Sequence, residues 1–426
     1  MNNEYVKKLT GKQPKDFEFA AAHIINNSDI EAFSALVEQS DFLFDFIKKN
    51  VEKRLSNAVN KGNYKNLMPF LTIYSNDYEE FIVSSLAKFA DEDLTDEMLE
   101  LLENGTDEQK AYCAKYFSHI NDTLAIDLLK KHAFCEFDAL ATNSAIALSA
   151  MQDKDSYNLA LEKLKSNDEF EQISAVRFLS AYKDENSLSA LFEAMKKSSM
   201  PENIASEIPY IKSFVELLDS EFKNDTILAI NHIINGIGEI ILLGQLFDFQ
   251  LFEVLQKLIN ISCTPHPNFY GSQARLELRP LPQGARELDS KAATVLLSAK
   301  LKFEQLTENE EYIFDENKDT KQEVYEIKNL LNHEPKEFWE TQKKLFVAEL
   351  SEKSDFVFSA LELVQELNLV EAFDKLKELL NSSNQTIILK TIEVIKHLGK
   401  INEIDKNQIL EKISDENIKA IIQSLF

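Results

Sequence analysis

Cysteine is scarce in this sequence. The 426 residues include three of them, Cys113, Cys135 and Cys263. So small and odd a number argues against a disulfide framework and fits a reducing compartment. The stretch from Met1 to Leu9 also lacks the apolar core of a secretory signal peptide. We therefore expect a cytoplasmic protein.

Basic residues are also in short supply. Lysine and arginine together number 46, against 72 aspartates and glutamates, and the formal net charge is −26. Nucleic acids and anionic membranes both attract proteins through basic surfaces. The charge balance therefore predicts neither of them as a partner. An acidic surface of this kind either meets a protein partner or only keeps the chain soluble, and composition leaves both interpretations open.

Apolar stretches long enough to span a membrane are missing as well. A transmembrane helix needs about 20 nearly continuous apolar residues. The most apolar segment, from Ile227 to Leu258, contains Asn231, His232 and Glu239. We predict that it forms one or two buried helices and that the chain does not insert into a membrane.

Known catalytic motifs do not occur. The sequence has no Gly-x-Ser-x-Gly, no phosphate-binding loop and no His-Glu-x-x-His. Cys263 and His266 have the spacing of half a zinc site, but no second pair of suitable spacing follows. We therefore assign no catalytic residue, metal ligand or cofactor, and we favour a non-enzymatic protein over an enzyme.

What the sequence does contain is an internal repeat of 31 residues, from about Ala20 to Met195. One position of the repeat is Asp or Asn in six successive units: Asp29, Asn60, Asp91, Asp122, Asp153 and Asp184. Four other positions are apolar in 22 of 24 occurrences, where the overall apolar content of 44% would give between ten and eleven. Two of these apolar columns are Ile24, Leu55, Leu86, Phe117, Leu148, Leu179 and Leu36, Leu67, Met98, Leu129, Ala160, Leu191. A fixed period of this length is typical of repeat architectures.

Within a unit the apolar positions follow helical spacing, interrupted by a polar turn. Each unit is therefore predicted to be helix–turn–helix. In the unit around Asp122, the first helix carries Cys113 and Phe117, and the second carries Leu129. The Asp or Asn falls just before the second helix, where its side chain can accept a hydrogen bond from a free backbone N–H. Since one helix pair cannot bury its apolar face alone, we expect the units to stack into an all-α superhelix.

These units resemble a known repeat family. Paired helices of this length, a polar turn with Asp, and small residues in the first helix (Ala114, Ala145 and Ala175) resemble HEAT repeats, in particular the short HEAT-like type of phycobilisome-lyase-related proteins. Ankyrin and tetratricopeptide repeats have similar periods, but their signature motifs do not occur here. The resemblance covers about two thirds of the chain and implies an α–α superhelix, that is, a HEAT-like solenoid.

The pattern predicts six segments along the chain. They are an N-terminal tail or cap (1–16), six HEAT-like repeats (17–199), out-of-register buried helices (200–261), a loop insertion rich in Pro and Arg (262–286), helices with an acidic mobile segment (287–350), and HEAT-like repeats with a C-terminal cap (351–426). Individual helices are expected at 202–222, 287–303, 324–331, 336–350 and 415–426. One continuous solenoid with an embellished middle is favoured over two solenoid arms joined by a central piece.

Residues 262–286 carry the candidate binding site. The segment holds four of the nine prolines and three of the five arginines, and such a proline density is incompatible with a helix. The candidate binding residues are Arg275, Arg279, Arg286, His266, Phe269 and Tyr270. The arginines could clamp a carboxylate or phosphate, and the aromatic pair could form a recognition tip. The alternative is structural: the arginines pair with acidic neighbours and the rings anchor the loop.

Together these patterns predict a protein-binding scaffold or adaptor. The second helices of successive units would present an extended acidic surface, with a basic protein segment among the expected partners. The resemblance implies an alternative, a bilin-lyase-like protein or chaperone that holds a small anionic ligand on the arginines. A third possibility, a HEAT-like DNA glycosylase, requires a basic DNA channel that the charge balance does not favour.

Overall fold

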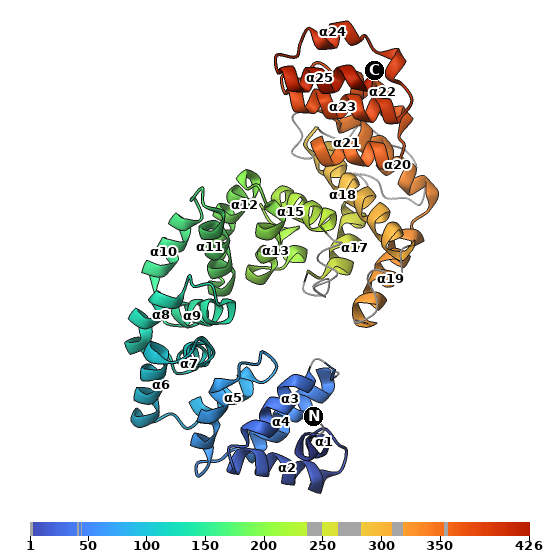
Figure 1. Cartoon of the computed structure of the whole chain (residues 1–426). Coiled ribbons are helices and arrows are strands. Elements are labelled where there is room, and N and C mark those ends of the chain that lie inside the picture. The colour runs from blue at the N-terminus through green and yellow to red at the C-terminus, as the bar shows by residue number, and fades with distance from the viewer. Residues whose placement is uncertain are drawn as a thin grey trace. The chain divides into compact units, whose positions relative to one another are not determined.

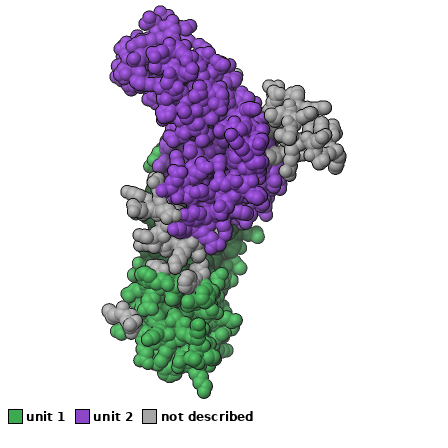
Figure 2. Space-filling model, turned by 90° about the vertical axis from the view of Figure 1, so that its right-hand side faces the viewer, with its two compact units in different colours: residues 1–191 green, residues 192–426 purple. Residues whose placement is uncertain are grey.

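Helices make up all the regular secondary structure of the described residues, which contain no strand. The computed structural model describes residues 3–40, 42–43, 45–236, 249–262, 283–308, 318–352 and 357–426. The prediction of an all-α protein is therefore confirmed. The chain divides into two compact units, residues 1–191 and 192–426, which Figure 2 shows in green and purple.

The first unit is a succession of short helices, many of them in pairs (Figure 1). In chain order they are α1 (Glu4–Leu9), α2 (Pro14–Asn26), α3 (Ile30–Ser40), α4 (Asp45–Ala58), η1 (Tyr64–Thr72), α5 (Glu79–Ala87), α6 (Glu92–Asn104), α7 (Asp107–Ile120), η2 (Thr123–Ala125), α8 (Ile126–His132), α9 (Asp138–Ala150), α10 (Lys154–Lys163), α11 (Glu169–Tyr182) and η3 (Glu185–Ser187). Helix α12 (Leu188–Lys197) crosses into the second unit. The predicted N-terminal tail or cap is thus helical over α1.

The predicted capping positions are confirmed in five of the six 31-residue repeats. The carboxylates of Asp29, Asp91, Asp122, Asp153 and Asp184 each accept a hydrogen bond from a backbone N–H two or three residues further on. In four of these five repeats the residue directly before the Asp has a positive φ: Ser28, Asn121, Gln152 and Lys183. A left-handed residue ends one helix and the Asp begins the next, so two consecutive residues reverse the chain.

The apolar columns of the repeats form the interior of the first compact unit. Every side chain of the two columns beginning at Ile24 and Leu36 is 0% exposed. Helix α7 packs against α5 and α9, and α9 packs against α11, so the first helices of successive pairs lie side by side. The second helices α6, α8 and α10 pack against the first helix of the pair that follows. Burial of an aliphatic side chain of this size contributes about 1.5–3 kcal/mol, and the columns place that burial between neighbouring pairs.

The second helix of the repeat around Asn60 departs from the prediction. We expected an α-helix here, but the segment folds as the 3₁₀-helix η1, with Pro69 inside it. Proline lacks the backbone N–H that an α-helix needs in its interior. Asn60 also accepts a hydrogen bond from a backbone N–H two residues further on, but that residue, Gly62, lies in a turn before η1. Leu67 and Leu71 nevertheless stay fully buried, so the apolar column survives the change of helix type.

The second unit is helical in all the parts that are described. Its helices are α13 (Pro201–Ile211), α14 (Phe214–Leu217), α15 (Lys223–Asn235), α17 (Leu251–Ser262), α18 (Gln283–Glu308), α19 (Lys318–His333), α20 (Lys336–Glu349), α21 (Val357–Glu366), η5 (Val370–Ala372), α22 (Phe373–Leu379), α23 (Gln385–His397), η6 (Ile401–Glu403), α24 (Lys406–Leu410) and α25 (Glu416–Leu425). Helix α18 packs against α15, α17, α19 and α20 and is the centre of this part. The described parts of the apolar segment from 227 to 258 lie largely in two helices, α15 and α17, many of whose apolar side chains are buried.

Two helix boundaries in the second unit were predicted wrongly. The expected helix over 202–222 is broken, because Lys212 has an extended backbone and the Ser213 side chain caps α14 by accepting from the Glu216 N–H at 3.3 Å. The expected loop 262–286 is too long at both ends, since Ser262 closes α17 and α18 begins at Gln283. Pro282 is the last proline of the segment, so no proline opposes helix formation after it.

The C-terminal helices follow the predicted pattern. Asp415 caps α25 by accepting from the Asn417 N–H at 2.8 Å, as expected for the opening helix of a last unit. Asn368 and Gly399, 31 residues apart, both have positive φ at the ends of first helices. Trp339 packs edge-on against Phe338 in the interior. None of the helices in the described residues has both the length and the apolar character that a membrane span requires.

Candidate functional site

The candidate residues of the 262–286 segment are not placed by the structure. Arg275, Arg279, His266, Phe269 and Tyr270 lie outside the described residues. Arg286 belongs to the first turns of α18, where the backbone is described but the side chain is not. Whether the three arginines gather around a ligand therefore stays a prediction.

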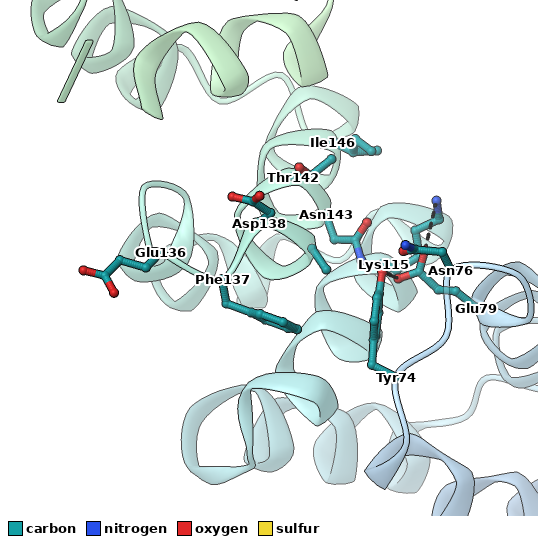
Figure 3. Close-up of a pocket in the computed structure, with 11 residues that line it drawn as sticks. Tyr74, Asn76, Glu79, Lys115, Glu136, Phe137, Asp138, Thr142, Asn143 and Ile146 are labelled. Atoms are coloured by element: carbon teal, nitrogen blue, oxygen red, sulfur yellow. Dashed lines mark hydrogen bonds and ion pairs between the residues drawn. The ribbon is translucent and has the colours of Figure 1, made fainter. Parts of the chain in front are cut away.

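The first unit contains an open cavity of about 670 Å³ (Figure 3). Helices α5, α7 and α9 and the loops before α5 and α9 supply its walls. The lining residues are Tyr74, Asn76, Glu79, Lys115, Glu136, Phe137, Asp138, Ala139, Thr142, Asn143 and Ile146. We expected a binding surface on the second helices, whereas this cavity lies among the first helices of three successive pairs.

The loop before α5 is held in place by Tyr112 of α7. The Tyr112 hydroxyl donates to the Ile73 carbonyl oxygen at 2.9 Å and accepts from the Ser75 N–H at 3.2 Å. Tyr74 lies between these two anchored residues, and its ring contacts the Tyr112 ring at 5.3 Å between centroids. The position of Tyr74 in the cavity wall is therefore fixed from both sides along the chain.

Glu79 is the centre of the polar side chains in the cavity. Its Oε1 atom accepts from the Asn143 amide at 2.5 Å and from the Tyr74 hydroxyl at 3.0 Å. The same Asn143 amide nitrogen donates to the Ala111 carbonyl oxygen at 3.1 Å. These bonds join α5, α7 and α9, because Glu79, Ala111 and Asn143 each belong to a different one of the three helices. Figure 3 shows the three side chains of Tyr74, Glu79 and Asn143 converging.

The protonation of Glu79 is shifted by its surroundings. The residue is only 8% exposed, and burial raises the pKa of its carboxyl group, because a buried carboxylate loses its hydration. The Lys115 charge and the hydrogen bonds from Asn143 and Tyr74 lower the pKa but do not offset burial. Burial also raises the pKa of the Tyr74 hydroxyl, so Tyr74 stays a neutral donor to Glu79.

Lys115 is a weakly held cation. Its ammonium lies 3.8 Å from Glu79 Oε2 and 3.8 Å from Glu80 Oε2, distances that are too long for hydrogen bonds. Glu80 also lies 3.4 Å from His119. Thus, among the described residues, Glu79 Oε1 accepts two hydrogen bonds, while Glu79 Oε2 has only a loose ion pair.

The rim of the cavity combines an aromatic ring with carboxylates. The Phe137 ring meets the Tyr74 ring edge to face, with 5.9 Å between centroids. Asp138, the first residue of α9, forms an ion pair with Arg177 of α11, and Glu136 directs its carboxylate away from the Tyr74–Asn143 cluster (Figure 3). Three carboxylates and one ammonium line the cavity, which favours a positively charged ligand.

Thiol and metal chemistry have no counterpart in this cavity. Cys113 is buried and Cys135 half-buried, burial raises the pKa of both thiols, and neither lines the cavity. The described residues contain no group of three or more His, Cys, Asp and Glu that could hold a metal ion. The arrangement is suited to hydrogen bonding and ion pairing with a ligand.

One sequence signal could have indicated the cavity. Asn143 occupies the repeat position that holds Phe81 and Tyr112 in the two preceding units, both of them buried. A polar amide in a buried aromatic column needs hydrogen-bond partners. Its partner Glu79 lies 64 residues earlier, so the partner could not be found from the sequence.

No protein-family model matches the chain, and no curated protein matches it in sequence.

Proposed function

We propose that this protein is a non-enzymatic scaffold that binds a protein partner on the first-helix surface of α5, α7 and α9. The observation that supports it most is the cavity around Glu79. It is open, it is lined by the first helices of three successive pairs and by two loops, and it combines aromatic walls with an excess of carboxylates. These are features of a recognition site for a polar or cationic group of a larger ligand.

We propose that the architecture behind this surface is a HEAT-like solenoid with a period of 31 residues. Support comes from the Asp caps at 31-residue spacing and from the fully buried columns between neighbouring pairs. Stacked pairs present extended surfaces on which one partner segment can contact several units.

A basic segment is the partner that the charges favour. The chain carries a net charge of −26, and no lysine or arginine occurs between Lys88 and Lys110, a stretch that contains α6 and nine acidic residues. We propose that long-range attraction to such acidic surfaces steers the partner and that the cavity provides the specific contact. The free thiols Cys113 and Cys135 support a role in the cytoplasm, which localisation of a fluorescent fusion in the source cell would test.

The test is selection of peptides on the purified full chain. A displayed library of random 12-residue peptides is selected on the wild type, and the enriched peptides are synthesised and their affinities measured at low and high salt. Thr142 is exposed on the cavity wall, so Thr142→Trp should fill the cavity and weaken binding at least about tenfold, a loss of about 1.4 kcal/mol. Ala150→Trp, an exposed change at the other end of α9, is the matched control and should stay within about twofold.

Two outcomes would contradict the proposed function. One is that no basic peptide family is enriched on the wild-type chain. The other is that enriched peptides bind the Thr142→Trp and Ala150→Trp variants equally well, because the cavity would then take no part in recognition. Circular dichroism of both variants establishes that their helix content is unchanged.

A further inference from the structure

We infer that the cavity takes an arginine side chain of the bound segment, with its guanidinium group on Glu79 and its flat face against the aromatic wall. This inference rests on the proposed function, because it names the group that the scaffold recognises. It is carried by three features of the cavity: an acceptor with spare capacity, two aromatic rings, and a displaceable cation.

The acceptor is Glu79 Oε2. The two hydrogen bonds from Asn143 and Tyr74 go to Glu79 Oε1 and fix the orientation of the carboxylate. Oε2 receives no hydrogen bond from a described residue, and its nearest cation is 3.8 Å away. A carboxylate oxygen that is already oriented loses little further freedom when a donor arrives, and hydrogen bonds to charged groups are the stronger ones.

The aromatic wall consists of Tyr74 and Phe137, whose rings meet at the cavity. A guanidinium group stacks on an aromatic face more readily than a compact ammonium group does. The same unit contains one such pair, since the Arg54 guanidinium carbon lies 3.9 Å from the Phe17 ring centroid. The rim also holds a guanidinium already, that of Arg177 on Asp138.

The displaceable cation is Lys115. Its ammonium makes no hydrogen bond to a described residue and lies at equal distances, 3.8 Å, from Glu79 Oε2 and Glu80 Oε2. Rotation toward Glu80, which is more exposed, would keep its ion pair and release Glu79 Oε2. A guanidinium spreads its charge over a plane, so it tolerates the remaining Lys115 charge better than a lysine ammonium from a partner would.

The experiment uses the small probe Nα-acetyl-arginine-N-methylamide with the full chain. Ile146 lines the cavity, and its δ1 methyl group, assigned by its loss in Ile146→Val, reports binding in methyl-TROSY spectra. We expect a saturable shift of this methyl signal with the arginine probe at millimolar concentration. The corresponding citrulline probe, which has the same shape without the charge, should give at least about tenfold weaker binding, and the lysine probe should be at least about threefold weaker.

Two variants with the same change in net charge separate local from long-range effects. Glu79→Gln keeps an acceptor for Asn143 and Tyr74 but removes the charge, and should weaken the arginine probe at least about tenfold. Glu100→Gln lies on the exposed side of α6, outside the cavity, and should stay within about twofold. Unchanged helix content and an unchanged Ile146 signal in the free state of Glu100→Gln complete the control.

The results distinguish this inference from the proposed function. Equal binding of the citrulline and arginine probes, or binding by Glu79→Gln within about twofold of the wild type, would overturn the arginine assignment. Peptide binding that is still lost in Thr142→Trp would then leave the scaffold proposal standing with a different recognised group. A selective arginine shift that Thr142→Trp and Glu79→Gln both abolish supports the inference.

Discussion

Asn143→Ala removes the side chain that joins three helix pairs of the first unit. Asn143 is 4% exposed, and its amide donates to the buried Glu79 carboxylate at 2.5 Å and to the Ala111 carbonyl oxygen at 3.1 Å. A hydrogen bond to a charged group contributes about 1.5–3 kcal/mol and a neutral one about 0.5–1.5 kcal/mol. The variant should therefore destabilise the local structure by about 2–4 kcal/mol.

Hydrogen exchange followed by mass spectrometry suits this measurement, because the chain has two compact units and global unfolding need not be two-state. Under conditions where opening is at equilibrium, 2 kcal/mol corresponds to about 30-fold faster exchange. We expect this acceleration in peptides from α7 and α9. Thr142→Ala, the exposed neighbour on the same helix, is the control and should change exchange by less than about twofold.

A double-mutant cycle identifies the source of the loss. In a Glu79→Gln background the carboxylate charge is gone, so Asn143→Ala should cost only about 1–2 kcal/mol. The reasoning is refuted if Asn143→Ala accelerates exchange of α9 less than about threefold, or if its cost is the same with and without the Glu79 charge. The first result would mean that the buried bonds contribute no more than bonds to water, and the second that the Glu79 charge does not strengthen them.

Three further predictions concern stability. Burial, and to a smaller extent Glu80, raise the pKa of Glu79, while Lys115, Asn143 and Tyr74 lower it; the net shift is upward. The native state therefore binds more protons than the unfolded state from about pH 4.5 upward. The contribution of Glu79 to stability should then fall as the pH rises above about 4.5. In urea denaturation Glu79→Gln should be more stable than the wild type at pH 7, and the gain should vanish below about pH 4.5. A gain that is independent of pH would contradict this. Asp153 caps α10 by accepting from the Ser156 N–H at 2.9 Å and pairs with Lys130 at 2.9 Å, so Asp153→Ala should cost about 1–2 kcal/mol by urea titration, and Asp153→Asn, which keeps the cap, less than half of that. Leu129 is 0% exposed between α8 and its neighbours, and Leu129→Ala should lower stability by about 2–5 kcal/mol, whereas a loss below about 1 kcal/mol would show that the predicted column is not part of the core.

Local sequence determined much of the secondary structure. Asp91, Asp122, Asp153 and Asp184 stand at the helix starts that their spacing predicts, because capping depends on a side chain and backbone groups two or three residues away. The apolar columns at Leu36 and Ile24 are buried for the same kind of reason, since helical periodicity sets which side chains share a face. Around Pro69, which lies inside the 3₁₀-helix η1, the apolar pattern predicted the buried side chains correctly but the type of helix wrongly.

The cavity was decided by the tertiary structure alone. Tyr74, Glu79, Lys115, Phe137 and Asn143 lie up to 69 residues apart, and none of them belongs to a motif. They meet only because α5, α7 and α9 pack side by side, which brings residues two repeats apart within hydrogen-bond distance. The sequence by itself therefore determined the helices and their buried faces, through interactions within a few residues, while the positions of polar groups across stacked pairs depended on packing between distant parts of the chain.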